Sequence, residues 1–142
     1  MTIVAAVDES DRAPAVAREA ASLAVAFDEP LHVVNVLTRS EFVSLMRTSV
    51  ESTGQAVDMD EIRSVAAEIA DEAAANLDTA YEPVGMMGDP ADTVIEYAEE
   101  QNARYIVIGP RKRSPTGKAL FGSIAQSVLL NATCPVVSII DQ

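Results

Sequence analysis

The sequence predicts an α/β fold, an open parallel sheet with helices packed on both of its faces. Short apolar runs alternate along the chain with longer segments whose apolar residues recur at helical spacing. Helical crossovers between strands imply parallel pairing, with helices on both sides of the sheet. Apolar residues make up 49% of the chain and are mostly Ala, Val, Ile and Leu, as expected for helices on buried strands. The length of 142 residues suits one domain spanning residues 1–142.

The first strand is predicted at residues 3–7, an apolar run too short for a helix, and Asp8 follows it directly. A helix rich in Ala comes next. Ser10 or Asp11 is its expected N-cap, and Pro14 is tolerated in its first turn.

Leu31–Leu37 is the second predicted strand. Residues 38–57 are polar and poorly periodic, and we interpret them as a long connection with a single helical turn around residues 42–46. A connection of this length inside a compact domain often marks a functional or mobile loop. Helical apolar spacing returns between residues 58 and 77.

The third strand is predicted at residues 81–87. Pro83 within it favours an edge position, because proline cannot donate a hydrogen bond to a neighbouring strand. In the next helix Asp89 is a good N-cap, and Pro90 suits the first helical position. Asp92 falls at the third position, where a carboxylate interacts favourably with the helix dipole.

Two more strands complete the alternation. Residues 105–108 form the fourth, a basic loop covers residues 110–118, and Gly122-Ser123 opens a helix. The fifth strand runs from Pro135 to Ile140. With no repeat or linker in the chain, a single sheet is the expected result.

The formal charge is −12, from 22 acidic and 10 basic residues, so the chain as a whole repels nucleic acid and anionic membranes. An acidic composition poor in Lys suggests adaptation to high salt; an ordinary acidic cytosolic protein is the alternative. No signal-like segment precedes the first strand and no apolar run reaches the length of a membrane span, so a cytoplasmic protein is expected. The single cysteine, Cys134, excludes an internal disulfide and is interpreted as a small buried side chain.

The segment 109–123 carries the strongest chemical signal. It holds four of the ten basic residues within eight positions: Arg111, Lys112, Arg113 and Lys118. The loop starts at the carboxyl end of a strand and ends at a helix N-terminus, where free N–H groups attract phosphate. Gly122 would allow close backbone approach, and Ser123 adds a hydroxyl. The alternative is a solvated loop that pairs with the acidic surface.

Asp8 lies at the carboxyl end of the first predicted strand, where ligands bind in open α/β sheets. It could orient a metal ion or a ribose, or it could cap the following helix, and the residues alone leave both readings open.

The sequence does not match other nucleotide-binding or catalytic motifs. Gly117-Lys118 is followed by Ala119, which breaks the phosphate-loop pattern, and no Gly-x-Gly-x-x-Gly follows the first strand. The only histidine, His32, lies within an apolar strand and is interpreted as structural, so a Ser-His-Asp triad is not expected. Met86-Met87 is interpreted as core or as the wall of a pocket.

Several short matches along nearly the whole chain resemble the universal stress protein family. They are Val7-Asp8, the Leu31–Leu37 strand, Gly88-Asp89-Pro90, Ile106-Val-Ile-Gly109, Gly122-Ser123 and Cys134-Pro-Val-Val137. The nucleotide-binding branch carries Gly, two residues, Gly, nine residues, Gly, then Ser or Thr. Gly109, Gly122 and Ser123 keep that spacing, whereas Lys112 replaces the middle glycine.

The resemblance implies the adenine nucleotide alpha hydrolase-like fold, with sheet order 3-2-1-4-5, and ATP or another adenine nucleotide as ligand, with Mg²⁺ near Asp8. It places the nucleoside against the backbone of Ala6, Val7, Asp8 and Val36. It places the phosphates among Gly109, Arg111, Lys112, Gly122, Ser123 and Ile124.

Three functions follow as hypotheses. The first is an ATP-binding stress-response regulator, homodimeric through the edge strand from Pro135 to Ile140, with little or no catalysis. The second, favoured by Lys112, is a dimeric interaction module that binds no nucleotide. The third is slow ATP hydrolysis, for which the sequence offers no identifiable general base.

Overall fold

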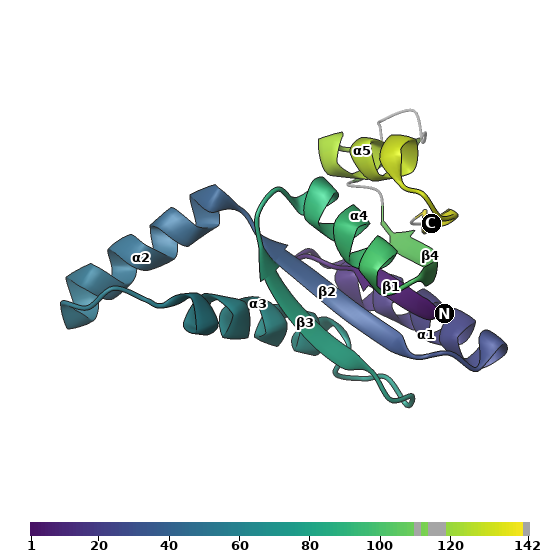
Figure 1. Cartoon of the computed structure of the whole chain (residues 1–142), viewed down its shortest axis with the longest axis horizontal. Helices are drawn as coiled ribbons and strands as arrows, with labels where there is room; N and C mark the ends of the chain where they lie inside the picture. The colour runs from purple at the N-terminus through teal and green to yellow at the C-terminus, as the bar shows by residue number, and fades with distance from the viewer. Residues whose placement is uncertain (110–111, 114–118, 141–142) are drawn as a thin grey trace.

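The computed structural model describes residues 1–109, 112–113 and 119–140 (Figure 1). Its helices are α1 (Ala13–Phe27), α2 (Arg39–Thr53), α3 (Met59–Ala73), α4 (Pro90–Glu100) and α5 (Ser123–Asn131). Its strands are β1 (Thr2–Ala6), β2 (Leu31–Leu37), β3 (Glu82–Met87), β4 (Ala103–Ile108), β5 (Lys112–Arg113), β6 (Ala119–Leu120) and β7 (Val136–Ser138). No helix among the described residues has the length and apolar content needed to cross a membrane.

Five strands form one parallel sheet in the order β3-β2-β1-β4-β7, which confirms the predicted order 3-2-1-4-5. β3 lies at one edge, as Pro83 indicated, and β7 lies at the other. β5 and β6 form a separate antiparallel pair, with β5 inside the predicted loop over residues 110–118 and β6 directly after it.

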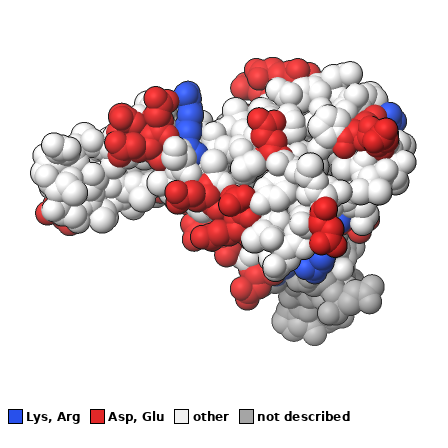
Figure 2. Space-filling view, turned by 90° about the horizontal axis from the view of Figure 1, so that it is seen from below, with Lys and Arg blue, Asp and Glu red and all other residues white. Residues whose placement is uncertain are grey.

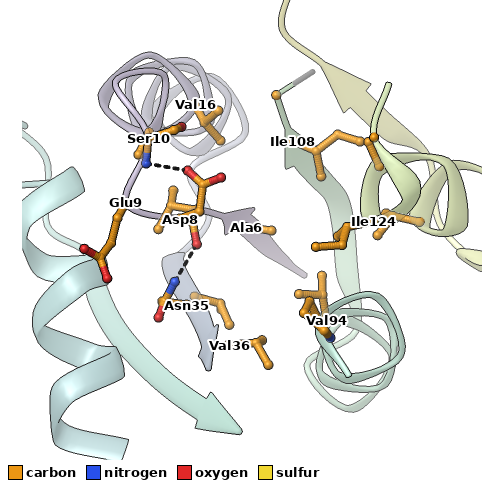
Figure 3. A pocket seen from close by; sticks show the side chains of 18 of the residues that line it. Ala6, Asp8, Glu9, Ser10, Val16, Asn35, Val36, Val94, Ile108 and Ile124 are labelled. Atoms are coloured by element: carbon orange, nitrogen blue, oxygen red, sulfur yellow. Dashed lines mark hydrogen bonds between the residues drawn. The ribbon is translucent and has the colours of Figure 1, made fainter. Parts of the chain in front are cut away.

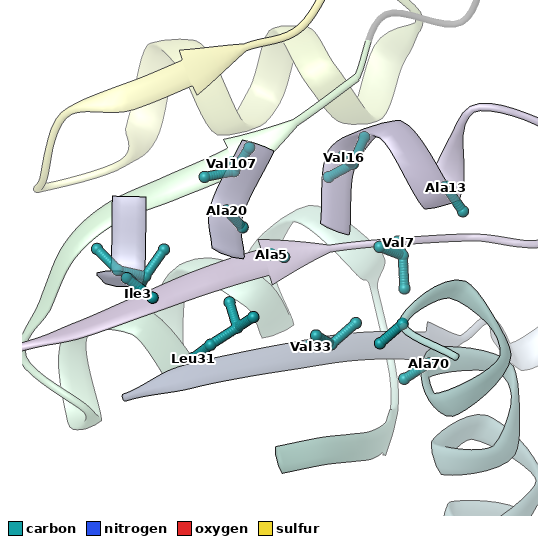
Figure 4. Packing of buried hydrophobic residues seen from close by; sticks show 12 residues of the cluster. Ile3, Ala5, Val7, Ala13, Val16, Ala20, Leu31, Val33, Ala70 and Val107 are labelled. Atoms are coloured by element: carbon teal, nitrogen blue, oxygen red, sulfur yellow. The ribbon is translucent and has the colours of Figure 1, made fainter. Parts of the chain in front are cut away.

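Helices cover both faces of the sheet, as predicted. Side chains of α1 and α3 pack on one face, in the cluster that includes Ile3, Ala5 and Val33 (Figure 4). Side chains of α4 and α5 pack on the other face, around Val4 and Ile106. Successive residues of β1 therefore serve opposite faces, the alternation that a strand backbone imposes. The two layers keep the central strands dry and leave their carboxyl ends as the accessible part of the sheet.

The starts of two helices test the predicted caps. In α4 the Asp89 side chain accepts the Asp92 N–H at 3.0 Å and Pro90 takes the first position, as predicted. The prediction that Ser10 or Asp11 caps the first helix is wrong. α1 begins at Ala13 without a side-chain cap, and the Ser10 hydroxyl instead accepts the Arg12 N–H at 3.3 Å in the preceding turn.

The prediction of a long connection over residues 38–57 is also wrong, because α2 occupies most of it. Thr38 and Glu41 form a reciprocal capping box at its start, and Gly54, at φ 75°, ends it. No residue of α2 is buried, and the helix projects from the body of the molecule (Figure 1). A helix that faces mostly solvent needs no continuous apolar stripe, which is why its periodicity is weak.

The other predicted boundaries differ by a few residues. α3 ends at Ala73 rather than near residue 77, and β4 begins at Ala103 rather than at residue 105. β7 covers only Val136–Ser138 of the expected fifth strand. Differences of this size are typical at element ends, where hydrogen bonding frays.

Gly85 lets the backbone of α3 pack directly on the edge strand β3. A Cβ atom at this position would lie 1.9 Å from the Arg63 carbonyl oxygen and 2.5 Å from the Ala67 nitrogen. Both neighbours are backbone atoms of one helix, so relief would require the whole of α3 to move away from β3.

Replacing Gly85 with Ala should therefore lower the free energy of unfolding by about 3 kcal/mol or more, at the upper end of overpacking costs. Gly54→Ala is the contrasting control. It introduces left-handed strain at φ 75° but meets no atom within 4 Å, so it should cost only about 1 kcal/mol. Urea denaturation of both variants measures the difference, and equal costs would contradict direct backbone packing at Gly85.

Candidate functional site

A cavity of about 410 Å³ opens at the carboxyl ends of β1, β2 and β4 (Figure 3). The first turns of α4 and α5 close one side, and α1 and the start of α2 close the other. β1 lies between β2 and β4, so the cavity occupies the point where the strand order reverses. Ligands of open α/β sheets bind at such reversal points, and the volume falls in the range of small-molecule sites.

The inner part of the cavity is apolar and its rim is polar. Aliphatic side chains converge from the sheet and from two helices: Ala6, Val36, Val94, Ile108 and Ile124 (Figure 3). Polar and charged groups lie toward the opening, among them Asp8, Glu9, Ser10, Thr38 and Glu41. An apolar floor with a few polar groups suits a flat organic ring that carries a polar tail.

Most of the residues predicted from the sequence meet at this cavity. Eight line it: Ala6, Val7, Asp8, Val36, Gly109, Gly122, Ser123 and Ile124. Arg111 and Lys118 lie outside the described residues, and of Lys112 and Arg113 only the backbone is described. The structure thus brings together the expected residues of β1, β2, β4 and α5.

Among the helices that begin at the cavity, α4 and α5 differ in how the N–H groups of their first turns are satisfied. In α4 the Asp89 carboxylate caps the first turn. α5 begins after Gly122 with no side-chain cap. N–H groups of an uncapped first turn carry the positive end of the helix dipole and seek an acceptor. Of these two helices, α5 is therefore the one prepared for an anion in the cavity.

Gly122 adopts φ −69° and ψ 174°, a conformation open to any residue. Its backbone conformation does not require glycine. A side chain at this position would therefore occupy space beside the cavity without straining the backbone. Gly109 is more confined, because a Cβ atom would lie 3.0 Å from a Val16 methyl group.

Asp8 does not cap α1. Its Oδ1 accepts the Ser10 N–H at 2.9 Å in an exposed turn, and its carboxylate points toward the cavity (Figure 3). Within the described ranges, no group of three or more His, Cys, Asp or Glu side chains is arranged to hold a metal ion. The described side chains near Asp8 therefore do not form a complete cation site, and a cation here would need ligand oxygens or water as well.

His32 lies away from the cavity, in the structural role that its apolar strand predicted. Its Nδ1 is 2.6 Å from the Tyr97 hydroxyl, and its Nε2 is 3.0 Å from the Glu82 carboxylate. Burial, and to a lesser extent the charge of Glu82, raises the pKa of Tyr97 to about 12. The phenol thus stays protonated and links α4 to β2.

The remaining singled-out side chains also pack in the core. Met86 contacts the cluster under α4 and α5, and Met87 contacts a smaller cluster around Ile62 and Ala66, as expected of core residues. Cys134 is half-buried against the former cluster, and burial raises the pKa of its thiol. A raised pKa disfavours the reactive thiolate.

Asn35 is the site residue that sequence reasoning missed. Its side chain is only 5% exposed, and its Nδ2 donates to the Val7 carbonyl at 2.9 Å (Figure 3). The bond continues the β1–β2 pairing past the end of β1, where the Val7 N–H donates to the Val34 carbonyl. It fixes the peptide from which Asp8 projects. A lone amide inside an apolar strand is the signal that could have identified it, since buried polar groups need partners.

Val94, Thr38, Glu9 and Glu41 were missed as well. Val94 looks like any core position of an amphipathic helix, and nothing in its spacing marks a cavity wall. Thr38 and Glu41 reach the rim because α2 starts there, which the sequence interpretation did not expect.

Replacing Asn35 with Leu, of similar size, should leave the Val7 carbonyl without its partner. We expect a loss of about 1–3 kcal/mol in the free energy of unfolding, the cost of an unsatisfied buried polar group. Asn131→Leu is the matched control, because Asn131 makes a similar bond to the Ser127 carbonyl at 2.9 Å on the surface. Denaturant unfolding of both variants measures the contrast, and an equal loss at Asn131 would contradict the role given to burial.

Comparison with known proteins gives consistent matches over the whole fold. The sequence model of the Universal stress protein family matches residues 1–139. A universal stress protein of Methanocaldococcus jannaschii is 29% identical over 143 residues, covering 95% of this chain and 79% of the relative. The solved structure of a universal stress protein from Archaeoglobus fulgidus is 37% identical, with a TM-score of 0.59 and 98% of each chain covered.

Two further solved structures contain a nucleotide. A universal stress protein from Archaeoglobus fulgidus in complex with dAMP is 28% identical, with a TM-score of 0.55 and coverage of 98% of this chain and 97% of that one. A universal stress protein in complex with cAMP is 22% identical, with a TM-score of 0.63 and coverage of 100% and 98%, and its likeness shows the fold alone. With its sheet order and its match over residues 1–139, this chain belongs to the universal stress protein family.

Proposed function

We propose that the cavity binds an adenine nucleotide, with ATP as the expected ligand, and that the protein acts as a cytoplasmic stress-response regulator with little or no catalysis. The observation that carries this proposal is the uncapped N-terminus of α5 beside an apolar cavity at the reversal point of the sheet. A nucleotide combines an apolar ring with a phosphate tail, and the cavity offers a surface for each.

The proposed binding mode sets the nucleoside against β1 and β2 and the phosphates against β4 and α5. Ala6, Val7, Asp8 and Val36 face the nucleoside, and Gly109, Gly122, Ser123 and Ile124 face the phosphates. Arg111 and Lys112 would add positive charge beside them. The family relative solved in complex with dAMP supports an adenine nucleotide as the ligand class.

Asp8 is the residue proposed to hold Mg²⁺ indirectly. Mg²⁺ keeps several water molecules and bridges phosphate oxygens, so one carboxylate near the phosphates is enough to orient its hydration shell. Little catalysis is proposed because His32, the one histidine, is engaged by Tyr97 and Glu82 outside the cavity. Phosphoryl transfer to water needs a group that positions the attacking water.

Lys112 favours one alternative, an interaction module of the same family that binds no nucleotide. It stands where the nucleotide-binding pattern has its middle glycine. The Lys112 side chain would obstruct the phosphates if it occupied their position, and it would contact them if its ammonium group lay beside them.

The purified protein should bind ATP with Mg²⁺ more tightly than adenosine in calorimetry at high salt. Replacing Arg111, Lys112 and Lys118 with Ala should weaken ATP binding by about 1.5–3 kcal/mol for each charged contact made. Gly122→Val should abolish ATP binding by blocking approach to the α5 N–H groups, and the fold should survive because φ at Gly122 is −69°. Gly122→Ala is the gentler control.

Lys112→Gly separates the two roles of that lysine. Binding that strengthens would identify Lys112 as an obstruction, and binding that weakens, more at low salt, would identify a phosphate contact. Equal affinity for ATP and adenosine, or full ATP affinity in folded Gly122 variants, would leave the interaction module as the better account.

We also propose that the protein is a homodimer through the edge from Pro135 to Ile140. β7 is the outer strand beside β4. The Ile106 N–H donates to Pro135 and the Ile139 N–H donates to Ile108, so these residues point their backbone groups inward. By strand alternation, Val136 and Ser138 point theirs outward, toward a second copy.

Ser138→Pro should therefore abolish the dimer and leave the β4–β7 pairing intact, because proline removes an N–H that faces away from β4. Ser138→Ala keeps the N–H and should remain dimeric. Light scattering at high salt, where self-repulsion is screened, measures the mass. A monomeric wild-type protein at micromolar concentration would contradict the proposal.

A further inference from the structure

Helix α2 carries an apolar stripe that belongs to none of the core clusters formed by the described residues. Val43, Met46 and Val50 recur at a spacing of three and then four residues, the spacing of a helix-pairing seam. The side chains of Val43 and Val50 are 46% and 49% exposed. Together with Phe42, Arg47 and Glu51 they border a shallow groove along the helix.

The rest of α2 explains how the helix is held and why the stripe stays open. Phe42 and Leu45 pack on the cluster of Ile62 and Ala66. Phe42 also borders the groove, so the stripe begins where this contact with the body ends. Beyond this contact the helix projects from the sheet (Figure 1). Isolated helices of about 15 residues are marginal in water, so a contact along the free side would stabilise this one.

Charge separates α2 from the helices beside it. In a chain of formal charge −12, α3 carries five carboxylates and one Arg, and α4 carries four carboxylates with no basic residue. α2 carries Arg39, Glu41, Arg47 and Glu51, which cancel. Figure 2 shows carboxylates spread over the body and a mostly uncharged surface at the end of the projecting arm.

This charge pattern selects the partner. An interfacial membrane helix has a polar face rich in Lys and Arg, whereas the α2 charges are balanced and the body repels anionic lipid. A basic protein would be drawn to the acidic body rather than to α2. A second copy of this chain meets little repulsion at a helix that carries no net charge, and α2 is such a helix, as are α1 and α5.

We propose that α2 is a self-association surface, on which a second copy of this chain lays its own α2 antiparallel along the stripe of Val43, Met46 and Val50. The antiparallel direction keeps the two acidic bodies at opposite ends of the helix pair, whereas a parallel pair would set them side by side.

The proposed contact between two α2 helices is small, so it should bind weakly. A helix of 15 residues is about 22 Å long, and two such helices bury less than the roughly 800 Å² per partner of a standard interface. The association is therefore weak and depends on protein concentration and on salt, which screens repulsion between the bodies. It uses neither the cavity nor β7.

Sedimentation velocity over a range of concentrations at high salt tests the proposal in the Ser138→Pro background, which removes association through β7. The double change Val43→Gln and Val50→Gln removes the stripe and keeps good helix formers. It should lower the association constant about tenfold or more. Ser44→Gln with Thr48→Gln, at exposed positions outside the stripe, is the matched control and should associate like the parent.

Disulfide trapping gives a second readout that does not depend on affinity. In a Cys134→Ser background, single cysteines replace Val43, Met46 or Val50, and mild oxidation should yield covalent dimers from at least one of them, because seam residues approach within disulfide range. Cysteines at Ser44 or Thr48 should yield none.

Equal association of the stripe variant and the control would overturn the proposal, as would cross-linking that ignores the stripe. Loss of the parent's self-association on adding neutral phosphatidylcholine vesicles, with co-sedimentation of α2-intact protein only, would also overturn it in favour of a lipid surface. Failure of ATP to bind has no bearing on these outcomes.

Discussion

The central strand β1 hydrogen-bonds to a parallel neighbour on each side, and the candidate site depends on that arrangement. The chain leaves β1 toward β2 and β3, and later returns to the other side for β4 and β7. The connections that leave the carboxyl ends of β1 and β4 therefore run to opposite sides of the sheet. A gap remains between them at the carboxyl end of β1. Asn35 extends the β1–β2 pairing by one more residue through the Val7 carbonyl, so the wall that carries Asp8 is held by buried bonds. Buried polar pairs of this kind fix one backbone arrangement, because breaking them leaves a carbonyl without a partner.

Helices α4 and α5 contribute different groups to the cavity. α4 is closed by its own Asp89 cap and contributes Pro90 and Val94 as wall, whereas α5 presents uncapped N–H groups. This asymmetry gives the cavity an apolar side and an anion-seeking side without any dedicated basic residue among its described lining apart from Arg12. Family membership and cavity geometry rest on different observations, and each supports the proposal of an adenine nucleotide as ligand.

The sequence predicted well whatever depends on local pattern. Buried parallel strands appear as unbroken apolar runs, and the Asp89-Pro90 start of α4 satisfies two helix-start preferences at once. The sheet order and the set of eight lining residues, by contrast, came from the resemblance to a family and not from local pattern. The sequence predicted poorly what depends on solvent-exposed or long-range contacts. α2 lacks a buried stripe, and its only strong signals, the Thr38–Glu41 box and Gly54, are short. Asn35 and Val94 became site residues only when distant strands and helices met, a relation that no local spacing contains.

The carboxylates at the cavity rim have a kinetic consequence. Asp8, Glu9 and Glu41 outnumber Arg12 in the described lining of the cavity, and the chain has a formal charge of −12. An anionic ligand approaching from solution therefore meets net repulsion, although Arg111 and Lys112 are proposed to attract its phosphates at contact. Its association rate constant should rise with ionic strength, the opposite of a protein that steers its ligand by attraction. At 1 M salt the screening length is about 3 Å, so the carboxylates of the rim then repel an anion only when it is in contact with them. An anionic ligand would therefore associate slowly at low ionic strength and faster at high ionic strength. The salt concentration would then set the rate at which the cavity binds its ligand.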